Sequence, residues 1–175
     1  MNTAYKNMRA FWLDVKNLAN RKGVIEIGAD KISVAGLEMA FLDGETLKHI
    51  FVGTNSLGDS SLYFENNSPS GIGGIIGGHG NEKLQQAAAR MLAYASKLTA
   101  QMKSVPAGGE LPALTSGNDV CLFAVSADKL FFVHLPESEA RKPENPFYPM
   151  FAYSQQVLGF FKEQQAAAST KEARA

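Results

Sequence analysis

The first hydrophobic residues of the chain recur at steps of three or four residues, which is the spacing of an amphipathic helix. The positions in this stripe are Tyr5, Met8, Trp12, Val15 and Ala19. Thr3 is the expected N-cap, and Gly23 after two basic residues is typical of a helix end. Because Trp12 is in phase with its apolar neighbours, we interpret it as a core residue rather than as a stacking platform for a ligand.

Short apolar runs separated by turn residues follow this helix and predict strands. The runs span 24–27, 32–34, 37–42, 47–52 and 61–65. Asp43 and Gly44 lie between two of them, and Asp-Gly between apolar runs is typical of a hairpin. Residues 24–65 therefore predict between three and five strands.

A second helix is predicted to begin after Asn81, which is a suitable N-cap. Its apolar positions repeat at alternating steps of four and three: Leu84, Ala88, Met91, Ala95, Leu98 and Met102. A narrow seam with this spacing permits close packing on another surface. That surface is either the sheet of the same chain or the same helix in a second copy, and the sequence leaves both interpretations open.

The apolar runs 120–125 and 130–135 flank a four-residue turn and predict a hairpin. Neither run alternates polar with apolar residues, so we expect both faces of the hairpin to be covered. A last helix is expected from Met150. Apolar side chains lie most of the way round this helix, which indicates that it is buried or forms a contact surface.

These elements predict a single α+β domain over residues 1–165 and a flexible C-terminal tail over residues 166–175. The domain contains an antiparallel sheet of about five strands with helices packed on it, in the order α-β-β-β(-β)-α-β-β-α. This order resembles that of small bacterial α+β dimers such as type III secretion chaperones. It is also similar, less closely, to roadblock- and profilin-like domains, in which helices cover both faces of one sheet. The resemblance is one of element order and carries no functional residue.

Composition narrows the classes of partner. The chain has 175 residues, with 17 basic and 17 acidic side chains and a formal net charge of zero. A neutral chain argues against a nucleic-acid partner and removes charge repulsion between copies. The single Cys121 excludes an intramolecular disulfide. No signal peptide and no apolar run long enough for a bilayer are present, so we expect a cytoplasmic protein that does not bind membranes.

The segment 66–80 is polar and rich in glycine, and we expect a connection there rather than a strand. Its glycines precede a helix, where backbone N–H groups and the helix dipole can hold an anion. The candidate ligand-binding residues are Gly77, Gly78, His79, Gly80 and Lys83. Because the spacing matches neither a Walker loop nor a dinucleotide fingerprint, we favour a mobile loop. Ile72, Ile75 and Ile76 would then be anchors or contacts for another protein.

The other candidates for chemistry have structural explanations. His49 and His134 lie on predicted strands without a second ligand at metal-binding spacing, and we expect both to be structural. Cys121 lies inside an apolar strand, where a thiol is neutral and inert. We therefore expect no catalytic residue, no metal site and no cofactor.

Two functional hypotheses follow. The first is a non-enzymatic protein-interaction module, adaptor- or chaperone-like and homodimeric, because catalytic constellations are absent and apolar positions exceed what a simple two-layer domain needs. Its candidate interface residues are Leu84, Met91, Leu98, Met102, Phe151 and Phe160. The alternative is a small-molecule or nucleotide-binding protein, with or without enzymatic activity, that uses Gly71–Gly80 and the start of the following helix.

Overall fold

The structure is a computed structural model that describes residues 1–16, 31–77 and 80–172. In these ranges seven strands form one antiparallel sheet, in the spatial order β4-β3-β2-β1-β6-β7-β5. The strands are β1 (Val34–Asp43), β2 (Thr46–Asn55), β3 (Ser60–Glu65), β4 (Ile72–Gly77), β5 (Lys103–Pro106), β6 (Asp119–Val125) and β7 (Lys129–Pro136). The predicted α+β class is confirmed.

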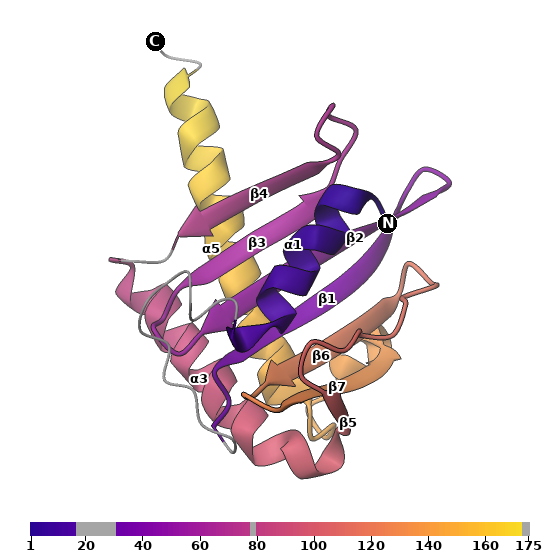
Figure 1. Ribbon diagram of the computed structural model, residues 1–175. Coiled ribbons are helices and arrows are strands. Elements are labelled where there is room, and N and C mark those ends of the chain that lie inside the picture. The colour runs from indigo at the N-terminus through magenta and orange to yellow at the C-terminus, as the bar shows by residue number, and fades with distance from the viewer. Residues whose placement is uncertain (17–30, 78–79, 173–175) are drawn as a thin grey trace.

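The helices are α1 (Thr3–Leu13), α3 (Glu82–Leu98), α4 (Glu137–Ala140) and α5 (Tyr148–Glu172), with a 3₁₀ turn, η1, at Thr99–Gln101. In Figure 1, α1 crosses one face of the sheet while α3 and α5 lie behind the other. The sheet is therefore the middle layer of three, and both of its faces are used for packing.

The strand count is larger than the five expected, because two segments expected as loops are strands at the edges of the sheet. β4 forms from the glycine-rich segment, and β5 forms from a segment that contains Pro106. Edge positions tolerate glycine and proline, because one side of an edge strand makes no ladder hydrogen bonds. The predicted strand at 24–27 lies outside the described residues.

The predicted hairpin at 120–135 is confirmed by β6 and β7, which pair from Asp119↔Pro136 to Val125↔Leu130. Successive side chains of β6 enter opposite cores, with Cys121 and Phe123 on the α1 side and Leu122 on the α3/α5 side. This alternation explains why β6 is apolar without interruption. In β7 only Leu130 is buried and the other side chains are half-buried or exposed, so the covered-hairpin prediction holds for β6 and only in part for β7.

Helix α1 begins one residue earlier than expected, with Asn2 rather than Thr3 as its N-cap. The Asn2 side-chain oxygen accepts a hydrogen bond from the backbone N–H of Tyr5 at 2.8 Å. Trp12 is buried, and its ring lies against Gly53, where an added Cβ would come within 2.8 Å of the ring. The interpretation of Trp12 as a core residue is confirmed. The expected helix end at Gly23 lies outside the described residues.

The seam of α3 packs within this chain. All six side chains of the predicted seam are buried, although α3 ends at Leu98 and the last of them follows η1: Leu84, Ala88, Met91, Ala95, Leu98 and Met102. Leu84 lies in a core with residues of β2, β3 and α5, and the others except Ala88 lie in a core with residues of β1, β6 and α5. Of the two interpretations left open by the sequence, docking on the chain's own layers is the one observed. Phe151 is also buried, and Phe160 is half-buried beside the α3/α5 core. Homodimerisation stays a prediction, but the six candidate interface residues already pack within the monomer: Leu84, Met91, Leu98, Met102, Phe151 and Phe160.

Helix α5 continues to Glu172, through most of the segment expected as a flexible tail. Figure 1 shows that its C-terminal part runs past β4, beyond the edge of the sheet. The mobility of residues 166–175 stays a prediction. None of the described helices is both long and apolar enough to span a bilayer.

Candidate functional site

The isoleucine- and glycine-rich segment singled out by the sequence lies on the open edge of the sheet. β4 pairs with β3 from Ile72↔Glu65 to Gly77↔Ser60. Within the described part of the chain no strand pairs with its other side. Half of the backbone N–H and C=O groups of an edge strand point away from its neighbour and can accept another strand.

The start of β4 is fixed by α1. Gly71 has a φ of +71°, in the left-handed region that favours glycine. Its carbonyl accepts a hydrogen bond from the side-chain amide of Asn2, the residue that caps α1. An added Cβ at Gly71 would come within 2.9 Å of that amide. The turn therefore needs glycine, and it sets where the edge strand begins.

The glycines of β4 make room for two aromatic rings from β3. An added Cβ at Gly73 would lie 2.5 Å from the Phe64 ring, and one at Gly74 would lie 2.8 Å from the Tyr63 ring. Because neighbouring residues of a strand face opposite sides, one ring lies over each face of the edge strand. Both rings are half-buried, so apolar surface continues out to the edge.

The outer edge of β4 also lacks the usual devices that prevent strand addition. Ile76 is 72% exposed, the most exposed large hydrophobic side chain among the described residues. The strand contains no charge and no proline, whereas β5, at the opposite edge, is only four residues long and carries Lys103 and Pro106. Short length, lysine and proline are how natural sheets block their edges. Among the described residues, one edge of this sheet therefore carries such protection and the other does not.

The predicted ligand-binding residues are not gathered into an anion site by the described structure. Gly77 ends β4, Gly78 and His79 lie outside the described residues, and Gly80 is in a turn. The Asn81 side chain accepts a hydrogen bond from the N–H of Leu84 at 3.1 Å, so it occupies part of the helix N-terminus itself. Lys83 is exposed. Ligand binding here stays a hypothesis that rests on sequence.

A second group of polar side chains lies buried beneath α1. The Glu38 carboxylate is fully buried in β1. It accepts hydrogen bonds from Arg9 Nε at 3.0 Å and from the Tyr5 hydroxyl at 3.2 Å, and Arg9 Nη2 lies 2.8 Å from it. Burial raises the pKa of Glu38, although the Arg9 charge opposes this. The pair joins α1 to the centre of the sheet.

His49 and Glu65 continue this group toward the β4 side. His49 Nδ1 lies 2.6 Å from Glu65 Oε2, and the backbone N–H of Asn2 donates to Glu65 Oε1 at 2.6 Å. Burial tends to raise the pKa of Glu65, but the hydrogen bonds from His49 and Asn2 outweigh it, and the pKa is lowered. His49 is buried in a partnered position, which agrees with the structural role expected for it.

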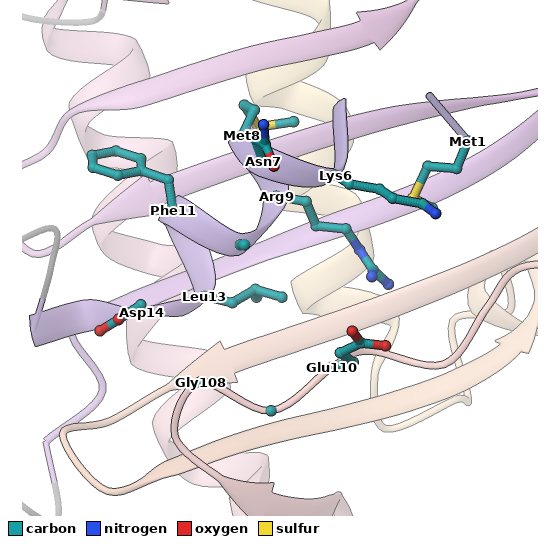
Figure 2. A pocket seen from close by; sticks show the side chains of 12 residues that line it. Met1, Lys6, Asn7, Met8, Arg9, Phe11, Leu13, Asp14, Gly108 and Glu110 are labelled. Carbon is teal, nitrogen blue, oxygen red and sulfur yellow. The ribbon is translucent and has the colours of Figure 1, made fainter. Parts of the chain in front are cut away.

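A groove of about 750 Å³ runs along α1 beside residues 108–110 (Figure 2). Its walls combine apolar Leu13 with charged Lys6 and Glu110. Arg9 reaches across the floor, where Nη2 donates to the carbonyl of Leu111 at 3.2 Å. The guanidinium is thus divided between β1 and the 111–112 segment, and its contacts make it a structural link between them.

The thiol of Cys121 is adjacent to this group, because Cys121 is directly opposite Glu38 in the sheet. Burial, followed by the nearby Glu38 charge, raises the pKa of Cys121 far above its ordinary range. A neutral buried thiol is a poor nucleophile. The expectation that Cys121 is inert agrees with this environment.

Sequence reasoning missed the Arg9–Glu38 pair. Two signals for it were present in the chain. Arg9 follows Tyr5 by four residues and therefore lies on the apolar face of the first helix, and Glu38 interrupts the apolar run 37–42 at a position that faces a core. When one element carries a positive charge on its core-facing side and another carries a negative one, the two charges are expected to form an ion pair.

Among the described residues, no group of three or more His, Cys, Asp or Glu side chains is arranged to hold a metal ion. Comparison of the chain with protein families, with curated proteins and with solved structures found no match. Inference about function therefore depends on this chain's own surfaces and side chains.

Proposed function

We propose that this protein is a non-enzymatic protein-interaction module, adaptor- or chaperone-like, whose binding surface is the open edge of β4. The partner contributes an extended segment that pairs with β4 as an additional strand. In this mode main-chain hydrogen bonds provide affinity, and side chains beside the edge provide selectivity.

The observation that carries the proposal is that no described strand pairs with the outer side of β4 and that the strand itself contains no charge and no proline, together with its apolar flanks. Ile76 is exposed, and the Tyr63 and Phe64 rings reach the same edge from opposite faces. Added apolar area of this kind stabilises a bound strand by about 25 cal/mol for each Å² removed from water. The contrast with β5 supports the proposal. The β5 edge of the same sheet carries a lysine and a proline that oppose strand addition, and β4 carries neither.

The polar group under α1 supports a structural role for that face. Glu38 and Arg9 satisfy each other, and Arg9 also binds a backbone carbonyl. Groups that are fully hydrogen-bonded to one another have little capacity left for a substrate. The interaction hypothesis is therefore supported by the β4 edge, and the described residues provide no comparable site for the ligand-binding alternative.

Affinity purification from the native host with three baits tests this function: the wild-type chain, Ile76→Lys and Leu42→Lys. Leu42 is 63% exposed in the β1–β2 hairpin, so Leu42→Lys is a matched hydrophobic-to-lysine control away from the β4 edge. We expect the Ile76→Lys bait to recover about tenfold less of its main protein partners than the wild-type bait, because a lysine on an edge opposes strand pairing. Equal recovery with all three baits would contradict the proposal.

A further inference from the structure

We propose that the strand received by the β4 edge is β4 of a second copy of this chain, which joins two sheets into one across a two-fold axis. This inference rests on the proposed function, because it names the partner of the same edge. It differs from helix-mediated dimerisation, since the α3 seam is buried within the monomer.

The β4 edge is suited to pairing with itself. It carries no charge, and the chain as a whole has a net charge of zero, so two copies do not repel one another at the contact. A two-fold contact needs a surface that is complementary to itself. An uncharged strand of small and branched residues meets that requirement, because no side chain has to find an opposite partner.

The sides that the residues face restrict the register. Ile72 packs with the α1-side core and Ile75 with the α3/α5-side core. Alternation then places Ile76 on the α1 side with Ile72. Directly opposite residues of an antiparallel pair must face the same side. One residue of β4 therefore lies directly opposite the same residue of the partner, with the two-fold axis midway between them, and a register centred between two residues is excluded.

A register centred on Gly74 uses the strand best. It places Ile72 opposite the partner's Ile76 and Gly73 opposite the partner's Ile75. Each exposed isoleucine then covers an isoleucine of the other copy. The partner's Ile75 lies where Gly73 has no side chain, beside the Phe64 ring that covers that glycine. At this pair a large residue meets a small one across the contact, which is how packed surfaces fit.

The course of helix α5 is compatible with this arrangement. Its C-terminal part runs past β4, as Figure 1 shows, and the helical backbone continues to Glu172. A sheet that continues beyond β4 would lie beside this extension. A second copy supplies such a continuing sheet, whereas a single bound peptide strand would not.

Sedimentation equilibrium over roughly a hundredfold range of protein concentration tests the dimer. We expect the wild-type chain to reach twice its 18.9 kDa mass and Ile76→Lys to weaken the dimer by at least about tenfold in dissociation constant. The Leu42→Lys control should match the wild-type chain. A wild-type chain that stays at 18.9 kDa throughout, or an Ile76→Lys chain that dimerises as tightly, overturns the inference.

Cysteine cross-linking tests the register. In the double variant Ile72→Cys/Ile76→Cys, the thiol at position 72 of each copy lies opposite the thiol at position 76 of its partner. The two Cα atoms are then about 4.5–5.5 Å apart, a separation that a disulfide can bridge. Mild oxidation should give a covalent dimer, while each single variant stays monomeric on a non-reducing gel. Cross-linking in a single variant, or none in the double variant, overturns the Gly74-centred register.

The two proposals fail in different ways. If the wild-type chain is monomeric but Ile76→Lys still loses protein partners in the affinity experiment, self-pairing is wrong and the edge binds another protein. If Ile76→Lys changes neither mass nor partners, the β4 edge is not the binding surface and both are wrong. Circular dichroism of each variant confirms that the fold is retained, which the exposure of Ile76 leads us to expect.

Discussion

Glu38 joins α1 to β1 through two side chains of the helix. Its carboxylate is fully buried, and its partners Arg9 and Tyr5 both come from α1. A buried ion pair contributes little net stability compared with apolar residues of similar shape, but breaking it leaves an unpaired charge in the core. The attachment of the helix is therefore sensitive to loss of one partner and tolerant of loss of both.

Replacing Glu38 with Ala should destabilise the fold by about 3–5 kcal/mol, because the Arg9 guanidinium loses its counter-charge in a buried position. The double variant Arg9→Met/Glu38→Leu should recover at least about half of that loss, since no buried charge remains. Urea denaturation of the double variant and of the single variants Arg9→Met, Glu38→Leu and Glu38→Ala measures this. Additive losses in the double variant would show that the two residues do not act as a pair.

Glu65 gives the fold a component of stability that depends on pH. Because its pKa is lowered in the folded chain from the ordinary value of 4.5, this component is present above that value and is lost as the pH falls through the folded-state pKa. Relative to Glu65→Gln, the wild-type chain should be most favoured near about pH 6 and lose that advantage toward about pH 3. Urea unfolding at both pH values checks this, with the exposed Glu163→Gln as the control that should show no such trend.

Single residues were predictable where their chemistry agreed with the pattern around them. Trp12 and Cys121 lie in phase with apolar neighbours, and both are buried as expected. Arg9 and Glu38 were harder, because neither strip of sequence shows the other partner. Their positions on buried faces mark each as a candidate for a buried ion pair, but which opposite charge each one meets becomes visible only when helix and strand are brought together.

At the scale of elements, the glycine-rich segment is the main surprise. Glycine disfavours strands, because it has no side chain to pack and much backbone entropy to lose. In β4 that cost is offset by the Tyr63 and Phe64 rings, which pack over the glycines from β3. A single-sequence pattern shows the glycines but not the neighbouring strand, so it predicts a loop. The long helix and the 120–135 hairpin were predictable because the pattern that identifies each lies within its own residues and does not depend on a neighbouring element.

The seam of α3 predicts a clear result for Met91, which is fully buried and accepts a hydrogen bond from the Ser154 hydroxyl of α5 at its sulfur. Met91→Ala should lower the free energy of unfolding by about 2–5 kcal/mol through the cavity it leaves. The loss should be the same at low and high protein concentration. Urea denaturation at two concentrations measures it, and a loss seen only at high concentration would place Met91 in an intermolecular contact.

At the scale of the whole molecule, the two edges of the sheet divide the surface into a protected end and an open end. In the described part of the chain, β5 carries charge and proline at one end, and no strand pairs with the outer side of β4 at the other. An open edge is a liability for a chain that stays alone, since it can template unwanted pairing. Its retention is consistent with a molecule that covers this edge in its working state.

A dimer through β4 predicts that thermal stability rises with protein concentration, because dissociation accompanies unfolding. For a chain of this size we expect the melting temperature of the wild-type protein to rise by about 2 °C for each tenfold increase in concentration. The melting temperature of the Ile76→Lys chain should rise less over the same concentrations. Circular dichroism melts at several concentrations check this, and a wild-type melting temperature that does not move counts against the dimer.

The position of Trp12 has a practical consequence. It is the only tryptophan of the 175 residues, and it lies between α1 and the sheet, against Gly53 and near Phe51. Its fluorescence emission is therefore a local reporter of whether the first helix is seated, while far-ultraviolet dichroism reports on the remaining layers. If the two signals change at different urea concentrations, a species is populated in which α1 has left the sheet while the sheet, α3 and α5 remain folded.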